Sequence, residues 1–317
     1  MKESMLEVSG LYKNYGKFCA VKNLDFSVNK GEVFGFLGPN GAGKTTTMKI
    51  ITGYLPMSKG LVKVAGRDIC ENGLESRKKI GYLPETTPLY TDMFVDEYLE
   101  FVGKLRGLCG ENLKKRIKKM LEVCGLEEMQ KKPIGHLSKG YRQRTGLAQA
   151  MIHEPELLIL DEPMSGLDPN QIVEIRELVK EIGKEKAVVY CSHILSEVAA
   201  TCNRILIIND GETAARGTPE EVITKAQGHI SYEVVIKTKD KNIEEKFKHI
   251  SQIQEIKAIV SSDTLNVKLK IETNSEKEIG EEIFDVAVKN NWKITLLSHK
   301  KITLEDVFSK LTRKDAK

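Results

Sequence analysis

Residues 33–45 read VFGFLGPNGAGKT, and this stretch decides the fold. Its first five residues form an uninterrupted apolar run, as a strand buried on both faces requires. The rest fits the pattern G-x-x-x-x-G-K-[ST], in which a glycine-rich turn lets backbone N–H groups wrap around phosphate groups. A helix is expected over 44–52, and its N-terminus adds positive charge density at the same place. The stretch therefore predicts a strand, a phosphate-binding loop and a helix.

A second apolar run, residues 157–160, ends in the two carboxylates Asp161 and Glu162. In such a site Lys44 reaches the β- and γ-phosphates, and the Thr45 hydroxyl ligates Mg²⁺. An acid at the end of a neighbouring strand also holds the metal, and Asp161 fits that role. Glu162 is placed to polarise an attacking water as a general base. Alone these acids would be an ordinary solvated strand end, but together with the loop they predict hydrolysis of a nucleoside triphosphate.

Strands and helices alternate after these motifs, which favours a parallel α/β sheet. The expected elements are a helix over 170–183, a strand over 186–191, a helix over 194–202 and a strand over 204–208. Before the first motif, residues 1–30 are typical of short strands joined by turns. Between the motifs, residues 94–131 carry apolar side chains at helical spacing. The basic residues 114–116, 118 and 119 are interpreted as the solvated face of an amphipathic helix rather than a DNA-binding patch.

The pattern changes near residues 217–230. From 231 to 298 the expected order is strand, helix (242–249), strand, strand, helix, strand, followed by a last helix. This β-α-β-β-α-β order is that of the split βαβ, or ferredoxin-like, unit. It contains no motif with chemistry, so a packing or regulatory role is expected.

Composition limits the classes of function that remain. The chain has 317 residues, 40% of them hydrophobic, and a net charge of +4. So weak a charge gives no support for nucleic-acid binding. No apolar stretch is long enough to span a bilayer, and the acidic start does not fit a signal peptide. The six cysteines are scattered, as expected of reduced thiols in a cytosolic chain.

Five further stretches complete a set that resembles the ATP-binding-cassette (ABC) ATPases. LSKGY at 137–141 is similar to the ABC signature LSGGQ, and SGLD at 165–168 resembles the D-loop. His193 resembles the switch histidine, Tyr15 the adenine-stacking aromatic residue of the A-loop, and Glu85 occupies the Q-loop position. The resemblance covers about residues 5–220.

The resemblance implies an α/β fold of the P-loop NTPase class. Residues 1–222 would be an ABC ATPase nucleotide-binding domain, with a RecA-like core and antiparallel β and α-helical subdomains. Residues 223–317 would be a small α+β ferredoxin-like accessory domain. The implied catalytic residues are Glu162, His193 and Lys44, and the implied metal ligands are Thr45, Asp161 and Glu85. The implied contacts to ATP are Tyr15, Gly38, Pro39, Asn40, Gly41, Ala42, Gly43, Lys44, Thr45, Thr46, Glu85, Ser138, Gly140, Asp161 and Asp168.

This sequence departs from the family pattern at three positions. Lys139 replaces a glycine and Tyr141 replaces a glutamine in the signature, whereas Ser138 and Gly140 are kept. Glu85 replaces a glutamine, and a carboxylate near a γ-phosphate is repelled unless a cation screens it. A coupling role is therefore favoured for Glu85 over a catalytic one. Ser138 also fits a plain helix N-cap, and the two roles are compatible.

A narrower resemblance is to the drug-, sodium- and gliding-motility-type subfamily, and within it to the gliding-motility-associated ATP-binding subunits. It is carried by LSKGYRQR, Glu85 and the LEDVF tail at 304–308. It implies an ATPase that serves a separate type-two, export-class membrane permease. The implied cofactors are ATP and Mg²⁺.

The implied partners are a second copy of the chain, joined head to tail, and integral membrane permease subunits, with no nucleic acid. The implied place is the cytoplasm, at the inner face of the cell membrane. The surface from Glu85 to Tyr98 is the candidate contact with the permease. The alternative is a soluble, non-transport ABC ATPase of the translation or DNA-repair type.

Overall fold

The structure is a computed structural model. It describes residues 3–227, 230–238, 240, 242–247, 249–260, 266–273, 278–300 and 304–312. The chain divides into two compact units, which meet in the sequence between Pro219 and Glu220, and each is described by itself. Within the described residues, no helix combines the length and the apolarity needed to cross a membrane.

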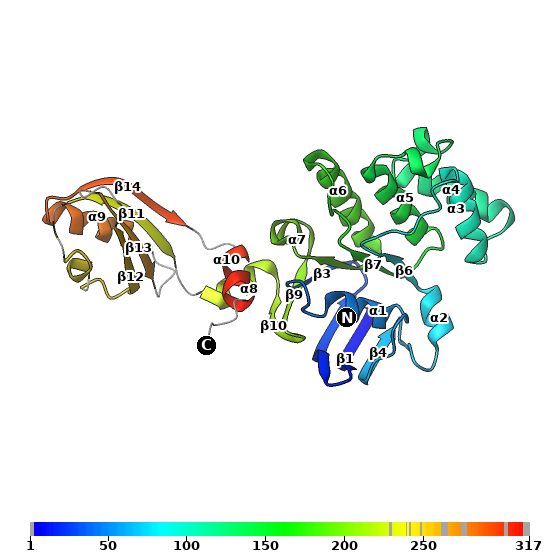
Figure 1. Cartoon of the computed structure of the whole chain (residues 1–317), viewed down its shortest axis with the longest axis horizontal. Coiled ribbons are helices and arrows are strands. Elements are labelled where there is room, and N and C mark those ends of the chain that lie inside the picture. The colour runs from blue at the N-terminus through cyan, green and yellow to red at the C-terminus, as the bar shows by residue number, and fades with distance from the viewer. Residues whose placement is uncertain are drawn as a thin grey trace. The chain divides into compact units, whose positions relative to one another are not determined.

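The first unit is built on a six-stranded sheet with the order β10-β9-β3-β8-β7-β6 (Figure 1). Its strands are β3 (Glu32–Leu37), β6 (Ile80–Leu83), β7 (Leu157–Asp161), β8 (Ala187–Ser192), β9 (Arg204–Asn209) and β10 (Glu212–Gly217). Every residue of β3, β7 and β8 is buried, which explains their continuous apolar runs. All pairs are parallel except β9 with β10, so the carboxyl ends of β3, β7 and β8 meet at one edge. The predicted parallel α/β sheet is confirmed.

A second, antiparallel sheet has the order β2-β1-β4-β5. Its strands are β1 (Ser4–Tyr15), β2 (Phe18–Asn29), β4 (Lys59–Val64) and β5 (Arg67–Asp68). The two sheets share one hydrophobic core, in which the Phe26 and Phe34 rings stack with centroids 5.5 Å apart. This sheet is the antiparallel subdomain expected from the sequence.

Helices complete the first unit. They are α1 (Lys44–Ile51), α2 (Gly73–Lys78), α3 (Val95–Leu105), α4 (Gly110–Val123), α5 (Lys139–Met151), α6 (Pro169–Glu185) and α7 (Leu195–Thr201), with 3₁₀ helices at Glu127–Met129 and Ile134–His136. Helices α3, α4 and α5 pack on one another as a helical subdomain (Figure 1). The chain between α3 and α4 turns at Gly107, which has a φ of 85°. Residues 94–131 are therefore two helices and a 3₁₀ turn.

The solvated face predicted for α4 has one exception. Arg116 is buried, and it donates to the carbonyl oxygens of Met151 and Ile152 and pairs with Glu154. Its neighbours Lys115 and Lys118 are exposed as predicted. Arg116 thus ties α4 to the end of α5, and its interpretation as a solvated residue is wrong.

The second unit carries a four-stranded antiparallel sheet with the order β12-β13-β11-β14 (Figure 1). Its elements are α8 (Pro219–Gln227), β11 (Ser231–Lys237), β12 (Ile253–Val260), β13 (Asn266–Thr273), α9 (Gly280–Lys289), β14 (Lys293–Lys300) and α10 (Leu304–Thr312). Strand β13 lies between β11 and β12, as a split βαβ unit requires. The helix expected over 242–249 is instead a 3₁₀ helix, Glu244–Phe247, and residue 248 lies outside the described residues.

Candidate functional site

The loop between β3 and α1 has the backbone that its glycines allow. Gly41 and Gly43 have φ values of 82° and 102°, in the left-handed region that favours glycine. A Cβ added at Gly38 would lie 2.6 Å from the carbonyl oxygen of Ile208, so the loop passes too close to β9 for any side chain. Helix α1 has no side-chain N-cap. Its first N–H groups therefore face the loop, as an anion site requires.

Lys44 stands at the start of α1 and is buried, with 7% of its surface exposed. Its Nζ donates to the carbonyl oxygens of Gly38 at 2.6 Å and Pro39 at 3.3 Å. The ammonium group is thus held inside the curve of the loop. This is where a lysine that contacts phosphate oxygens has to lie.

Asp161 and Glu162 end β7 at the same edge of the sheet. Asp161 is 2% exposed, and its Oδ1 is a buried oxygen without a hydrogen-bond partner among the described residues. Burial raises the pKa of the Asp161 carboxyl from 3.8 to about 6, and the nearby charges of Glu162 and Glu85 add to the rise. A buried carboxylate oxygen of this kind is a typical cation ligand.

Glu162 is held by the last residue of β8 and the residue that follows it. Its Oε1 lies 2.8 Å from Nδ1 of His193, and its Oε2 accepts a hydrogen bond from Oγ of Ser192 at 3.3 Å. Glu162 also has a φ of 52°, which a non-glycine residue rarely adopts. Ser192 was not foreseen from the sequence, although its place before His193 could have suggested it. The carboxylate is thus fixed by two side chains and a strained backbone.

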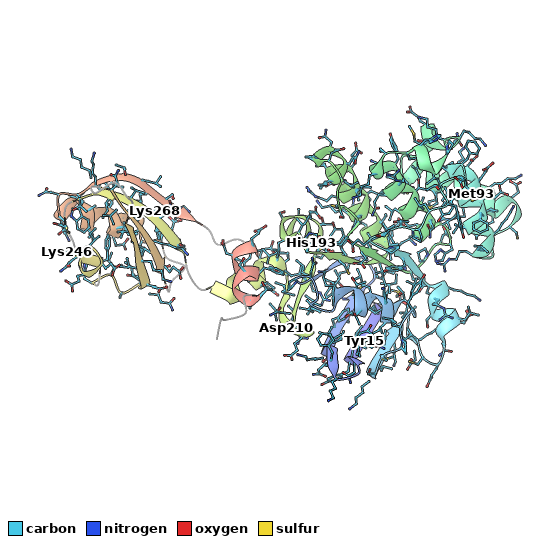
Figure 2. The ribbon with its side chains drawn as sticks, in the orientation of Figure 1. Tyr15, Met93, His193, Asp210, Lys246 and Lys268 are labelled. Carbon is cyan, nitrogen blue, oxygen red and sulfur yellow. The ribbon has the colours of Figure 1, made fainter. Side chains whose placement is uncertain are left out.

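A pocket of about 320 Å³ opens beside the loop. It is lined by Tyr15, Phe18, Ala20, Pro39, Asn40, Gly41, Gly43, Lys44, Thr45 and Thr46. Phe18 and Ala20 were not foreseen, because nothing in their sequence pattern distinguishes them from ordinary strand residues. Figure 2 labels Tyr15 and His193, which lie on separate segments of the first unit. The pocket thus brings Tyr15 together with seven of the ATP contacts predicted between residues 39 and 46.

The signature and D-loop residues lie apart from this pocket. Ser138 is the exposed N-cap of α5 and accepts a hydrogen bond from the Tyr141 N–H, so its predicted capping role is confirmed. Asp168 caps α6 in the same way, accepting from the Gln171 N–H at 3.0 Å. Neither residue, nor Gly140, lines the pocket in the described part of the chain.

Gly140 and Lys139 connect α5 to the D-loop segment. A Cβ at Gly140 would lie 2.6 Å from the end of the Gln171 side chain, so a larger residue there would displace the Gln171 amide. The Lys139 side chain packs on Gly166 of the D-loop. Lys139 therefore lies against its own D-loop.

Glu85 follows β6 and is exposed. Its charge is one of the causes of the raised Asp161 pKa, so it lies within electrostatic reach of that carboxylate. Among the described residues there is no cluster of three or more His, Cys, Asp or Glu side chains that could hold a metal ion. A cation at this edge would therefore need oxygen ligands from its substrate as well.

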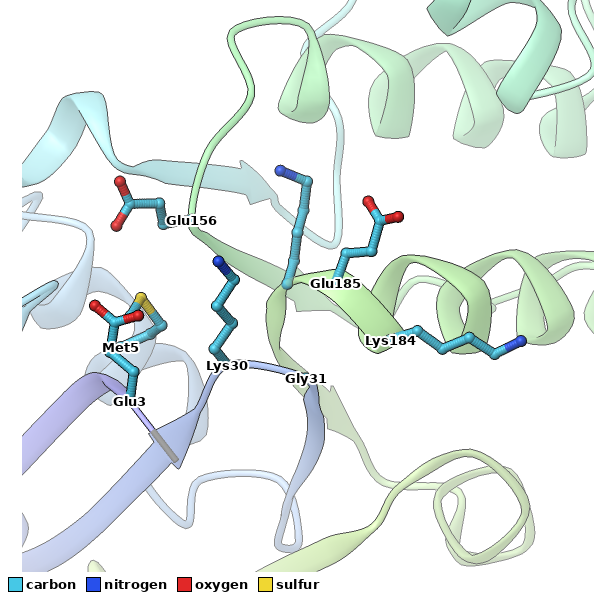
Figure 3. A pocket seen from close by; sticks show the side chains of 8 residues that line it. Glu3, Met5, Lys30, Gly31, Glu156, Lys184 and Glu185 are labelled. Carbon is cyan, nitrogen blue, oxygen red and sulfur yellow. The ribbon is translucent and has the colours of Figure 1, made fainter. Parts of the chain in front are cut away.

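A larger hollow, of about 790 Å³, lies at the opposite, amino edge of the sheet (Figure 3). Its lining residues are Glu3, Met5, Lys30, Gly31, Glu156, Lys184, Glu185 and Lys186. They bring equal numbers of basic and acidic side chains from separate segments, and they do not converge on one point. Lys186 Nζ donates to the Pro155 carbonyl, and Lys79 pairs with Glu156, so part of the charge at this edge is bound by neighbouring groups of the chain.

Comparison with known proteins decides the family. The family model for ABC transporters matches residues 21–165. The Bacillus subtilis ABC transporter ATP-binding protein YxlF is 34% identical over 307 residues, which is 97% of this chain and 99% of the relative. The chain belongs to the ABC transporter ATP-binding protein family.

One further relative and one solved structure support the same family for this ABC ATPase. The B. subtilis linearmycin resistance ATP-binding protein LnrL is 33% identical over 97% of this chain and 98% of its own length. The solved structure of cbiO1 from Clostridium perfringens, described as part of the ABC transporter complex cbiONQ, superposes with a TM-score of 0.65. It is 29% identical and covers 71% of this chain and 92% of its own. The chain is thus an ATP-binding, ATP-hydrolysing subunit with the P-loop NTPase fold.

Proposed function

We propose that this chain is the motor subunit of an exporter, and that it works as a head-to-tail pair. Each ATP would lie between the pocket of one copy and the signature residues Ser138 and Gly140 of the other. The proposal rests on one observation: within a single chain, the pocket residues and the signature residues lie apart. Lys44 and Thr45 line the pocket, whereas Ser138 is an exposed helix cap outside it. A site divided in this way is completed by a second copy, and ATP then joins the two subunits.

The residues of the pocket edge fit a bound Mg²⁺. The Asp161 Oδ1 is buried without a partner, which suits a cation ligand better than a solvated acid. Thr45 at the start of α1 is the second ligand, with Glu85 as a candidate third. When bound, Mg²⁺ neutralises phosphate charge and orients the transferred group.

Glu162 and His193 are the proposed catalytic pair. The Glu162 carboxylate accepts from Ser192 and bonds His193, so it is oriented before substrate arrives. Glu162 would take the proton of the attacking water, and His193 and Lys44 would stabilise the charge that develops on the γ-phosphate. The remaining predicted ATP contacts at 38–46, with Tyr15 and Asp168, are part of the same proposal.

In the partner copy, the N-terminus of α5 would face the γ-phosphate. Helix α5 is 13 residues long, and Ser138 satisfies one of its first N–H groups, that of Tyr141. The other N–H groups of its first turn can then donate to an anion. These N–H groups could bind the γ-phosphate by themselves, so the charge of Lys139 would not be needed there.

The contact with the permease is proposed for the surface from Glu85 to Tyr98. Tyr90 is 57% exposed, and its ring lies 6.0 Å from that of Tyr98 and 5.6 Å from that of Phe101. Tyrosines that are anchored on one side and open on the other are typical of interface cores. Through this contact the chain would be held at the inner, cytoplasmic face of the membrane.

The names of the relatives favour export as the direction of transport. LnrL is named for linearmycin resistance and matches along almost its whole length. This supports a type-two, export-class permease as partner, and it favours removal of a small molecule over a role in gliding motility. Residues 1–222 would then be the motor domain, and residues 223–317 an accessory domain.

A mixing experiment tests the divided site. Lys44→Ala and Ser138→Arg chains should each be inactive alone, since every site lacks one half. An equimolar mixture should regain about a quarter of the wild-type rate, because half the dimers are mixed and each keeps one intact site. If Ser138→Arg alone hydrolyses ATP at the wild-type rate, the site is complete in one chain and the proposal is wrong.

A second experiment tests the permease surface. Tyr90→Asp should abolish co-purification of a membrane protein from detergent-solubilised membranes, whereas Phe284→Asp, a matched change at an exposed aromatic residue of the second unit, should not. Recovery of the wild-type chain only with ribosomes or DNA would contradict a transport function.

A further inference from the structure

Tyr190 and Glu197 form a buried hydrogen-bonded pair that the proposed mechanism does not use. The Tyr190 side chain, on β8, is fully buried, and its Oη donates to Oε2 of Glu197 on α7 at 3.2 Å. Glu197 is only 5% exposed, although a buried carboxylate costs free energy that an apolar side chain would not. The pair thus joins β8 to α7 by a polar contact in a place where apolar packing alone would cost less.

The segment that this pair spans contains His193. Strand β8 ends at Ser192 and α7 begins at Leu195, so only His193 and Ile194 connect the two elements. The His193 side chain is 53% exposed, and packing therefore does little to hold it. Its distance of 2.8 Å to the Glu162 carboxylate depends instead on where the backbone of this two-residue connection lies.

Apolar contacts hold α7 on the sheet but do not fix its orientation. The helix has seven residues and no side-chain N-cap, and so short a helix is not stable by itself. A Cβ at Gly35 of β3 would lie 2.6 Å from the Val198 side chain, so the helix packs closely on the sheet. Such contacts are not directional, whereas a hydrogen bond is. The bond between Tyr190 and Glu197 therefore limits how far α7 can turn or slide along β8.

Charge effects show that Glu197 lies near the proposed catalytic pair. Burial raises the pKa of the Glu197 carboxyl, and the charge of Glu162 adds to the rise, whereas the hydrogen bond from Tyr190 opposes it. The charges of Arg176 and His193 also lower this pKa. The Nε of Arg176 is a buried donor without a hydrogen-bond partner among the described residues. Buried polar clusters of this kind are expected where function requires them.

We propose that Tyr190 and Glu197 are positioning residues for ATP hydrolysis, which hold α7 so that His193 stays within reach of the catalytic carboxylate. This inference rests on the proposed catalytic pair. Neither residue would touch ATP, and the hydrogen bond rather than the charge of Glu197 is what holds the helix. Displacement of a catalytic group by about 1 Å can cost about a hundredfold in rate. Loss of this one bond leaves the apolar contacts of α7 in place, so it should cost less.

Turnover of the full-length chain at saturating ATP tests this. Tyr190→Phe removes only the hydroxyl, and it should lower turnover about tenfold while ATP affinity stays within about twofold of wild type. In a His193→Ala background the same change should lower turnover no further, because the residue through which it acts is gone. The melting temperature should fall by about 3 °C in both backgrounds, since loss of a buried hydrogen bond costs stability whatever its role in catalysis.

Two further variants separate the hydrogen bond from charge and from stability. Glu197→Gln keeps an oxygen that accepts from Tyr190 and removes the charge, so turnover should stay within about threefold of wild type. Ile152→Val removes one methyl group from a fully buried side chain before the start of β7. It should also melt about 3 °C lower, yet its turnover should stay within about twofold of wild type.

The outcomes separate this inference from the function it rests on. If Tyr190→Phe keeps wild-type turnover, or lowers turnover equally in the His193→Ala background, the pair does not act through His193. An equal loss of turnover in Ile152→Val would reduce the effect to one of stability. A tenfold loss in Glu197→Gln would show that the charge is required, and the inference would be wrong. If His193→Ala itself hydrolyses ATP at the wild-type rate, the proposed catalytic pair is wrong and the inference fails with it.

Discussion

Both edges of the central sheet carry acidic and basic side chains, but the two edges differ in whether these side chains have partners. At the carboxyl edge, Asp161 keeps a buried oxygen unpaired and Glu162 has a left-handed backbone. At the amino edge, Glu156 pairs with Lys79 and Lys186 bonds a backbone carbonyl. The amino-edge hollow is also the larger, at about 790 Å³ against 320 Å³. Size and charge therefore do not distinguish the functional edge.

The difference lies in what each edge leaves unsatisfied. Unpaired buried groups and strained residues cost free energy, and they persist where a ligand or a reaction uses them. None of the residues that line the amino-edge hollow carries such a cost; His153, with a buried unpaired Nδ1, and Glu154, with a φ of 56°, lie before β7 but outside that lining. Substitutions at the carboxyl edge should therefore change catalysis and ligand binding, whereas matched substitutions at the amino edge should change neither.

A large loss of turnover is expected from His193→Ala. His193 bonds Glu162 and stands where charge develops on the transferred phosphate, so turnover should fall about a hundredfold with little change in ATP affinity. Steady-state ATPase assays combined with equilibrium binding check this. Lys184→Ala at the amino edge should stay within twofold of wild type. An equal loss in both variants would remove the distinction between the edges.

The next effect concerns stability and its dependence on pH. The Asp161 pKa is raised to about 6 in the folded chain, so the folded form keeps a proton that the unfolded form releases. Stability should therefore fall as pH rises from about 4 to 6, and the cost is complete above that window.

Removal of the Asp161 charge should reverse this cost. Asp161→Asn should stabilise the first unit at pH 7.5 by about 1 kcal/mol, which is about 2–4 °C in melting temperature, while it weakens Mg²⁺-dependent ATP binding. At pH 4 the gain should be smaller. A variant that melts below wild type at pH 7.5 would show that the carboxylate is not a destabilising charge.

The smallest effect is expected from Glu85→Gln. Glu85 is exposed and acts on Asp161 only through its charge, so the ATPase rate of the isolated chain should stay within about threefold of wild type. A hundredfold loss, about 2.7 kcal/mol of barrier, would instead make Glu85 a catalytic residue.

The catalytic core could be predicted from the sequence because its signals are local. The glycines of the loop, the apolar run of β7 and the acids after it each impose a structure on their immediate neighbours. Parallel strands then bring their carboxyl ends to one edge, so Lys44, Asp161 and His193 converge without further information. Ser138 was recognised as a cap for the same local reason, and it caps α5, which begins at Lys139.

What the sequence did not reveal depends on contacts between distant segments. Arg116 looked solvated among lysines, but it shares the buried stripe of Leu113 and Met120 and meets carbonyls at the end of α5. Phe18 looked like an ordinary strand residue until the hairpin placed it beside the phosphate loop. In the second unit, a short 3₁₀ helix stands where a longer helix was predicted, and its Phe247 is buried in the core.

The most direct test of the central claim is Glu162→Gln. Glutamine keeps the size of the side chain but cannot take a proton from water. The variant should bind ATP as tightly as wild type, lose at least about a hundredfold in turnover, and accumulate as an ATP-bound dimer in size-exclusion chromatography. Glu185→Gln at the amino edge is the control and should behave as wild type. Hydrolysis by Glu162→Gln at the wild-type rate, with no ATP-dependent dimer, would contradict the assignment of the carboxyl edge as the catalytic site.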